Sequence, residues 1–350
     1  MSVDLPDMPV TEHTVKTQRH TTFYLAAGPA NGPLVIFVHG WPELAISWRH
    51  QLPALAALGF RTIAPDMRGY GRSSVYSQPA AYAQEPIVRD MLELLDAVGR
   101  EQAVWVGHDW GSPVVWNLAS HHPDRCHAVA SLCVPYYTLE RGLDQLLSLV
   151  DRAVYPADEY PAGQWDYMLY YEENVAEAIA PLDASVIRSL KLLLRKGDPA
   201  GEGKPAPTAT ARRTHSLFGW PTHPVPDVPL DTDVLTEETL CGYVAALERN
   251  GFYAPACWYL NSGANAAYAR AAQNGGYLDL PVLFLNARYD PVTASAHSQV
   301  AEPMRTYCRQ LTEETIRAGH WLAQEKPVEV NAALVQWLAT RVPEVWPQPQ

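Results

Sequence analysis

An aspartate between two glycines is the feature of this sequence that first suggests chemistry. Asp109 stands in the run Gly107-His108-Asp109-Trp110-Gly111, after a strand-like stretch and before a helix-like one. This spacing is that of a nucleophile elbow, with Asp where Ser is more usual. The helix start would bring the Trp110 backbone N–H close to a developing oxyanion. Asp is also a favoured helix N-cap, so the motif alone leaves a simple capping role open.

Three further residues that could take part in catalysis follow other strand-like stretches. The run His39-Gly40-Trp41-Pro42 would supply a second oxyanion N–H from Trp41, and its Trp41–Pro42 bond is a candidate cis peptide. Asp290 follows a late strand, and His320 follows the last one. The chain order of nucleophile, acid and histidine is the order of a hydrolytic triad built on an elbow. Each motif alone is also compatible with an ordinary strand-end turn or a solvated surface group.

Taken together, these motifs resemble the epoxide hydrolases of the α/β-hydrolase fold. The resemblance rests on the three motifs around Trp41, Asp109 and His320 and on the run Asp66-Met67-Arg68-Gly69-Tyr70-Gly71-Arg72-Ser73, and it covers nearly the whole chain. It implies an α/β protein with a mostly parallel central sheet flanked by helices and an inserted helical cap. It also implies that Asp109 is the nucleophile, with Asp290 and His320 as its partners.

Two cap segments extend the resemblance to a pair of tyrosines. Residues 165–173 resemble the segment that carries the first ring-opening tyrosine, which maps to Tyr167, although Tyr170 or Tyr171 could be confused with it. Residues 252–261 resemble the segment that carries the second, which maps to Tyr259. This chain reads Ala-Pro-Ala-Cys-Trp-Tyr where the family usually has Gly-Pro-Leu-Asn-Trp-Tyr. The Trp-Tyr pair survives, so we expect the role of the tyrosine to be kept.

These residue types suit the opening of an epoxide. A carboxylate with a reference pKa of about 3.9 is ionised at neutral pH and can attack a strained carbon without a base. The ring oxygen leaves as a strongly basic alkoxide, and tyrosines with a reference pKa of about 10 can donate protons to it. The resulting ester on Asp109 needs water activated by His320, which Asp290 would orient. The net reaction gives a vicinal diol and requires no metal or organic cofactor.

Predicted strands and helices alternate in the first third of the chain, and these elements must position the candidate catalytic residues. Strands are predicted at residues 34–39, 61–65, 103–108 and 128–134, with helices at 47–58, 87–98 and 113–121 and a hairpin at 14–17 and 21–26. Helices are predicted at 165–180, 182–196, 236–250 and 327–339, and strands return at 281–286 and 314–318. The model that follows has a core of residues 1–134 and 280–350. The cap comprises residues 135–279, with an irregular Pro/Gly-rich section near 198–234.

The composition of the chain limits which classes of partner the protein can bind. The 350 residues carry a formal net charge of −12, which disfavours nucleic acid and anionic membranes. No signal peptide or membrane-length apolar run is visible, and five scattered cysteines fit a reducing compartment, so we expect a cytoplasmic protein. We expect three tryptophans to line the pocket and select a small apolar epoxide: Trp41, Trp110 and Trp258. The sequence does not tell whether the protein forms a homodimer or which epoxide is its natural substrate. It also leaves open the selectivity of the reaction and a physiological role such as detoxification.

Two other functions fit parts of the same pattern. Haloalkane dehalogenases share the fold and the Asp nucleophile, but a departing halide needs no proton and therefore no paired tyrosines. Haloacetate dehalogenases would want Arg beside the nucleophile, where this chain has Trp110 and Gly111. A serine esterase is excluded if Asp109 is the elbow residue. A non-catalytic ligand receptor on the same fold would be expected to have lost a catalytic residue, and none of the mapped positions is lost.

Overall fold

The central sheet of the computed structural model is mostly parallel. The structure describes residues 9–219, 224–293 and 298–348, so the ends of the predicted core and part of the irregular section lie outside it. Over these described residues the sheet has eight strands in the order β1-β2-β4-β3-β5-β6-β7-β8. The strands are β1 (Thr11–Lys16), β2 (Thr21–Ala27), β3 (Leu34–Val38), β4 (Arg61–Pro65), β5 (Ala103–His108), β6 (Cys126–Leu132), β7 (Leu278–Ala287) and β8 (Cys308–Ile316).

The strands of the sheet run parallel except at the edge formed by β1, β2 and β4. The central strands β3 and β5 are buried along their whole length and pair in parallel, as expected for strands covered on both faces. The first hairpin, β1 and β2, is antiparallel, and β2 also joins β4 antiparallel. All other neighbours run parallel, so the loops after β3, β5, β7 and β8 emerge at the same edge of the sheet.

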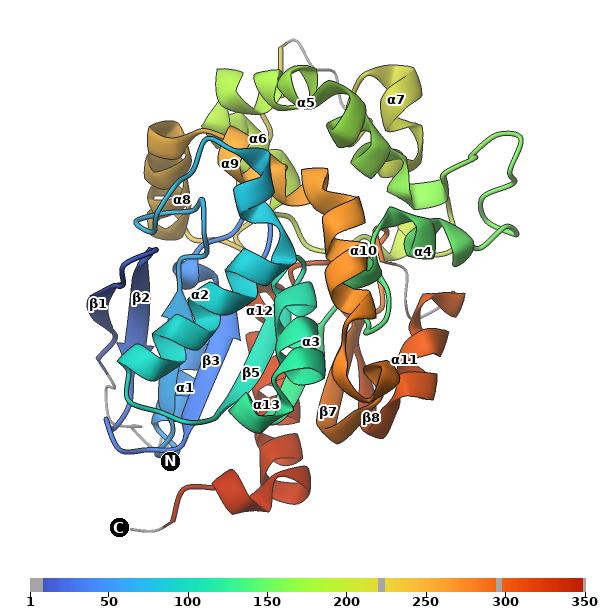
Figure 1. Cartoon of the computed structure of the whole chain (residues 1–350). Coiled ribbons are helices and arrows are strands. Elements are labelled where there is room, and N and C mark those ends of the chain that lie inside the picture. Colours follow the sequence, from blue (N-terminus) through green and yellow to red (C-terminus); the bar gives the residue numbers. More distant parts are fainter. Residues whose placement is uncertain (1–8, 220–223, 294–297, 349–350) are drawn as a thin grey trace.

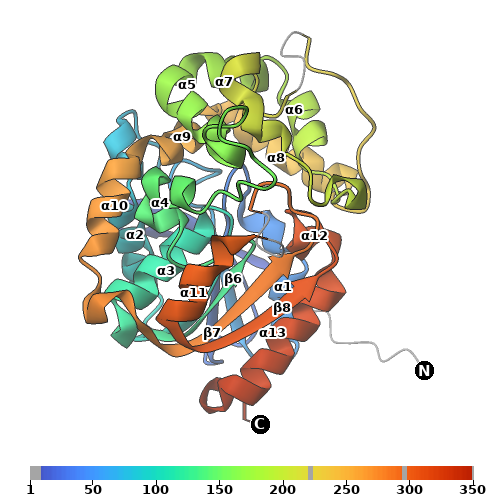
Figure 2. The same ribbon diagram turned by 90° about the vertical axis from the view of Figure 1, so that its right-hand side faces the viewer.

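Helices cover both faces of the sheet. Figures 1 and 2 show α2 and α3 on one face and α1 and α13 on the other. This gives the three-layer arrangement that buries a parallel sheet. The helices of the core are α1 (Gln51–Ala56), α2 (Gln84–Ala97), α3 (Gly111–His121), α11 (Glu302–Tyr307), α12 (Leu322–Glu325) and α13 (Pro327–Arg341).

A long helical insertion, residues 133–277, separates β6 from β7. Most of it lies above the sheet, at the top of Figures 1 and 2. Within the described residues of the 198–234 section, the chain forms short 3-10 turns and one helical turn. Its helices are α4 (Leu143–Ser148), α5 (Asp166–Ala184), α6 (Val186–Leu193), α7 (Ala211–Thr214), α8 (Glu237–Asn250), α9 (Tyr253–Ala256) and α10 (Ser262–Arg270).

Among the predicted boundaries that differ from the structure, those of two elements are wrong for identifiable reasons. The single helix expected over residues 182–196 is broken at Ser185, which has φ −155° and ψ 80°. Serine competes for backbone hydrogen bonds and so favours helix ends. The last strand begins at Cys308 rather than at residue 314, because β8 is paired only with β7 and its first half carries polar, solvent-facing residues. No helix in the described part of the chain is both long and apolar enough to cross a membrane.

Candidate active site

Asp109 lies on a sharp turn between β5 and α3, where the sequence predicted an elbow. Its φ is 50°, a left-handed conformation that is uncommon for a residue other than glycine. Helix α3 begins at Gly111 with Trp110 as its N-cap, and no cap hydrogen bond from a side chain holds it. The Asp109 Oδ1 atom instead accepts a hydrogen bond of 2.6 Å from the backbone N–H of Trp41. The capping role that the sequence left open therefore does not describe this carboxylate.

The glycines around Asp109 are needed because backbones touch there. A Cβ at Gly107 would lie 2.5 Å from the carbonyl oxygen of Gly111, and a Cβ at Gly111 would lie 2.1 Å from that of Val38. A Cβ at Gly40 would lie 2.4 Å from Asp109 Oδ1 and 2.6 Å from the backbone nitrogen of Trp110. Both backbone nitrogens expected at an oxyanion, those of Trp41 and Trp110, therefore lie close to Gly40. The Trp41–Pro42 bond is cis, which confirms that expectation.

The histidine and the two aspartates form one connected group. The Nδ1 atom of His320 lies 2.8 Å from Asp290 Oδ2, and its Nε2 atom lies 3.5 Å from Asp109 Oδ2. Asp290 is buried, and its carboxylate also accepts hydrogen bonds from the Thr293 hydroxyl at 2.8 Å and the Val292 N–H at 2.8 Å. These contacts fix the acid and leave one imidazole nitrogen facing Asp109. The structure thus brings together three of the residues that the sequence singled out.

Charge pairing sets the protonation of this group. Burial alone would raise the pKa of Asp290, but the His320 charge and hydrogen bond outweigh it and lower that pKa to about 2. Burial likewise opposes the charged form of His320, yet Asp290 and Asp109 together raise its pKa well above the usual value. In the resting protein the imidazole is therefore a cation between two carboxylates.

A second buried acid–histidine pair supports the first, and the sequence did not identify it. Glu43 Oε2 lies 2.7 Å from His108 Nδ1, and His108 Nε2 lies 2.7 Å from the carbonyl oxygen of His320. Burial opposes the charge on His108, but Glu43 overcomes it and raises the pKa of His108 to about 10. A protonated His108 can donate to both partners at once. Glu43 directly follows His39-Gly40-Trp41-Pro42, but nothing in sequence spacing alone indicates that its side chain points inward.

One cavity of about 370 Å³ is lined by several of the side chains predicted to be functional. Asp109, His320, Tyr167, Tyr259 and Trp41 all line it, together with mostly apolar side chains. The rings of Tyr167 and Tyr259 lie 5.7 Å apart, one from α5 and the other from the 3-10 turn before α10. Burial is the main cause that raises the pKa of both phenols. The Asp109 charge adds to it for Tyr167, and Tyr167 and then Asp109 add to it for Tyr259, so both phenols stay protonated and can donate.

The neighbours of Tyr167 occupy different positions. Tyr170 and Tyr171 are both buried and do not line this cavity. The Tyr171 ring stacks on that of Tyr259, with ring centroids 4.5 Å apart. The structure therefore favours Tyr167 over both neighbours as the tyrosine that faces Asp109.

Two of the three tryptophans expected in the pocket do not line it. Trp110 and Trp258 are buried against Tyr259, and of the three expected tryptophans Trp41 borders the cavity, where the described residues also place Trp321. The Trp258 ring packs on Trp110, and its indole N–H donates 3.1 Å to the carbonyl oxygen of Arg68. Successive residues of a 3-10 turn point about a third of a turn apart, so Trp258 and Tyr259 cannot face the same cavity. Trp258 supports the tyrosine from behind.

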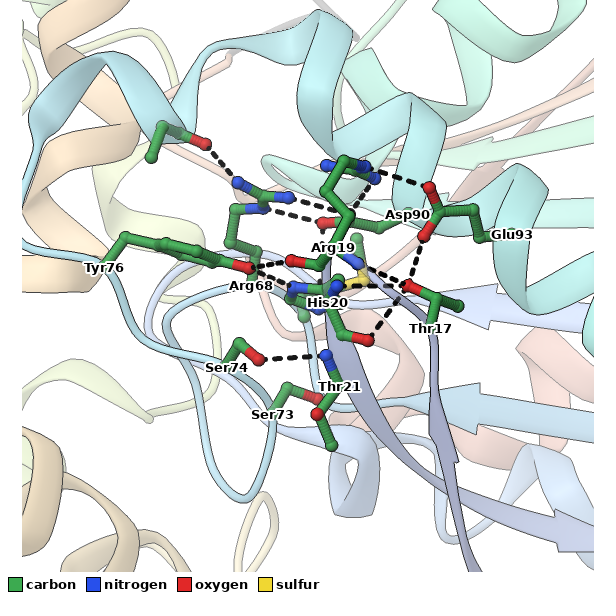
Figure 3. Close-up of polar contacts among 12 residues, drawn as sticks. Thr17, Arg19, His20, Thr21, Arg68, Ser73, Ser74, Tyr76, Asp90 and Glu93 are labelled. Carbon is green, nitrogen blue, oxygen red and sulfur yellow. Dashed lines mark hydrogen bonds and ion pairs between the residues drawn. The ribbon is translucent and has the colours of Figure 1, made fainter.

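An ion-pair network, shown in Figure 3, anchors the loop after β4, and the Arg68 carbonyl oxygen of this loop accepts the indole N–H of Trp258. The Arg68 guanidinium binds the buried Asp90 carboxylate through two contacts of 2.7 Å, and Arg19 binds the same carboxylate at 2.5 Å. His20 Nε2 lies 3.7 Å from Asp90, and its Nδ1 lies 3.0 Å from the Tyr76 hydroxyl. The network ties the β1–β2 turn and the loop after β4 to α2, so the backbone that receives the Trp258 N–H is fixed.

One group of side chains has the composition of a metal site. Within the described part of the chain, His108, Cys133 and His320 place ligand atoms within 4.8 Å of one another. Both nitrogens of His108 already contact Glu43 and a backbone oxygen, and those of His320 contact Asp290 and, at 3.5 Å, Asp109. The arrangement therefore suits proton transfer and support of His320 better than metal binding.

Comparison with known proteins agrees with this geometry. A family model described as the alpha/beta hydrolase fold matches residues 33–327. Epoxide hydrolase A of Mycobacterium tuberculosis is 35% identical over 341 residues, which cover 94% of this chain and 97% of that protein. This chain belongs to the epoxide hydrolase family of the α/β-hydrolase fold. A solved epoxide hydrolase A from Mycobacterium thermoresistibile has a TM-score of 0.74 at 35% identity, covering 95% of this chain and 99% of that one.

Other epoxide hydrolases differ in length. The bifunctional epoxide hydrolase 2 of Sus scrofa is 34% identical over 89% of this chain, but the match covers only 52% of that protein. The chain thus spans about half the length of such relatives. A solved epoxide hydrolase from an endophytic Streptomyces has a TM-score of 0.75 at 31% identity, covering 94% of this chain and 95% of that one. The family similarity is therefore to the α/β-hydrolase unit.

Proposed function

We propose that this protein hydrolyses a small apolar epoxide to a vicinal diol through a covalent ester on Asp109. The observation that carries the proposal is that a carboxylate on a strained turn and two phenols line one cavity. The mostly apolar lining favours an uncharged substrate. In this proposal residues 135–279 act as the cap on a core of residues 1–134 and 280–350, since the insertion supplies both phenols.

Ring opening uses Asp109 as the nucleophile and the two phenols as acids. The Asp109 oxygen forms a bond to one epoxide carbon while the bond from that carbon to the ring oxygen breaks. Tyr167 and Tyr259 hydrogen-bond the ring oxygen and deliver a proton to it. Their raised pKa values keep both hydroxyl protons in place until the alkoxide develops.

Ester formation itself prepares the base for the second step. When Asp109 becomes an ester it loses its charge, so one of the two anions that raise the His320 pKa disappears. The imidazole then gives up its proton more easily, and that proton can restore the phenol that ring opening left as a phenolate. The neutral imidazole takes a proton from a water molecule as the water oxygen bonds to the ester carbonyl carbon. The bond from that carbon to the substrate oxygen then breaks, which releases the diol and returns Asp109 to its carboxylate and His320 to its protonated form. Asp290 holds the ring in place through its 2.8 Å contact with Nδ1. The backbone N–H groups of Trp41 and Trp110 are the donors proposed to stabilise the oxyanion.

Product analysis tests this function against the nearest alternatives. Purified protein is incubated separately with an aryl epoxide and with a series of haloalkanes, and diol and free halide are quantified. The proposal expects diol and no halide. Halide release without diol would instead identify a haloalkane dehalogenase. Tight binding of the epoxide with no product from any substrate would identify a receptor on this fold.

A further inference from the structure

The short helix α12, directly after His320, contacts both the core and the insertion. The indole N–H of Trp321 donates 2.7 Å to the carbonyl oxygen of Leu193, at the end of α6. The Gln324 side chain donates 3.0 Å to Glu43, behind the active site. Through these two contacts α12 and its N-cap residue Trp321 join the core to the insertion. Its last residue, Glu325, makes the contact with the most direct consequence.

One carboxylate oxygen of Glu325 joins two distant segments of the chain. Its Oε2 atom accepts a hydrogen bond of 2.7 Å from the backbone N–H of Gly319 and one of 3.0 Å from the backbone N–H of Gly197. Gly319 immediately precedes His320, and Gly197 belongs to the insertion. Hydrogen bonds to a charged acceptor are roughly twice as strong as neutral ones. The bridge thus ties the histidine loop to the insertion at a single atom.

The two glycines allow this bridge because their backbones are in contact. A Cβ on Gly197 would lie 2.5 Å from the Gly319 Cα, and a Cβ on Gly319 would lie 2.5 Å from the Gly197 Cα. Neither glycine has the positive φ that would by itself call for glycine. The residue type at both positions is explained by the close approach of the insertion to the histidine loop.

A second bridge holds the other end of the same segment. Arg288, two residues before Asp290, pairs with Glu202 at 3.0 Å. Between the two bridges, Gly197, Asp198 and Gly201 line the cavity beside His320. This stretch of cavity wall is therefore attached at one end to the histidine loop and at the other to the loop of the triad acid.

We propose that Glu325 is a positioning residue that docks the 197–202 segment of the insertion on the histidine loop. In this role it sets both the place of His320 and the shape of the cavity wall. Its kinetic part rests on the function proposed above, whereas its structural part does not. A residue that only stabilised the fold would affect all steps and all substrates alike.

Amide hydrogen exchange tests the docking without any assay of activity. The full-length protein is produced with glycine that carries an isotope label at its nitrogen. NMR then follows amide hydrogen exchange at Gly197 and Gly319 in wild type and in Glu325→Ala. We expect both amides to exchange at least about tenfold faster in the variant, since each loses a charge-assisted hydrogen bond. Glu325→Gln should give an intermediate rate because its oxygen is neutral. Glu329→Ala, an exposed acid on the next helix, is the matched control and should change neither amide.

Steady-state kinetics tests the consequence for His320. In a two-step covalent reaction, kcat/KM reports the steps through ester formation, and kcat also reports ester hydrolysis. For an epoxide too short to reach the 197–202 wall, Glu325→Ala should lower kcat by about tenfold and leave kcat/KM unchanged. For a longer epoxide that contacts this wall, kcat/KM should fall as well. Equal losses in both parameters for both substrates would contradict the proposal.

A variant on the insertion side keeps the test valid if Glu325→Ala does not fold. Gly197→Ala leaves the carboxylate intact but pushes its new Cβ into Gly319, so exchange at Gly319 should again accelerate. Gly263→Ala is the control, because a Cβ there meets no atom within 4 Å. Unchanged exchange at Gly319 in Gly197→Ala would overturn the docking. Faster exchange in a protein whose wild type turns over no epoxide would retain the docking and refute the proposed function.

Discussion

The imidazole of His320 lies between two carboxylates, with Nε2 3.5 Å from Asp109 Oδ2. Its other nitrogen is 2.8 Å from Asp290. The two steps of the proposed reaction are coupled by this relationship, because attack by Asp109 removes one of the charges that hold the proton on the histidine. The coupling can be measured without substrate.

Asp109→Asn should lower the pKa of His320 and abolish turnover. The substitution removes the negative charge of Asp109, but Asp290 still raises the pKa of His320. The pKa of His320 should therefore fall without returning to its usual value. Histidine ring resonances followed by NMR over a pH titration measure it. The control is Asp124→Asn, an exposed acid remote from the cavity. An unchanged His320 titration would refute the coupling, and unchanged turnover would refute the nucleophile assignment.

Tyr167→Phe and Tyr259→Phe should each slow ester formation by about a hundredfold, since each removes a donor to the leaving oxygen. Rapid-mixing measurements of a single turnover separate this step from hydrolysis. Tyr171→Phe is the matched control, because its hydroxyl lies outside the cavity and has no hydrogen-bond partner among the described residues. A large effect in Tyr171→Phe with none in Tyr167→Phe would transfer the assignment.

These expectations illustrate how far the sequence reaches. The elbow and the motifs that contain Asp290 and His320 could be found from the sequence, because each motif is defined by neighbours in the chain. Tyr167 was implied only by a family resemblance, which left Tyr170 and Tyr171 open. Trp258 was misplaced, since the direction of its side chain depends on a 3-10 turn that leaves no clear pattern in sequence. Glu43 and Glu325 were missed because their partners lie far away in the chain. Contacts of this kind become visible only after the insertion and the core are assembled.

The network of Figure 3 predicts a pH dependence of stability. Burial, aided by Arg68 and Arg19 and opposed by Asp90, lowers the pKa of His20 to about 4. The unfolded chain has a histidine pKa of about 6.5, so between these values it binds more protons than the folded protein. The free energy of unfolding should therefore fall by about 3 kcal/mol as the pH drops through this window.

His20→Gln should remove this contribution, because glutamine does not titrate. Urea unfolding of both proteins at about pH 7 and about pH 4.5 provides the comparison. Other groups also titrate in this range, so the informative quantity is the difference between variant and wild type. Parallel loss of stability in the two proteins would show that His20 does not titrate with a lowered pKa in the folded state.

Trapping the covalent ester tests the central claim most directly. His320→Gln removes the base for the second step but leaves Asp109 and both tyrosines in place, so ring opening should proceed and hydrolysis should stop. After mixing this variant with an aryl epoxide, mass spectrometry of the digested protein should show the intact epoxide mass added to the peptide that contains Asp109. An inactive variant with an unmodified Asp109 peptide would contradict the covalent mechanism proposed here.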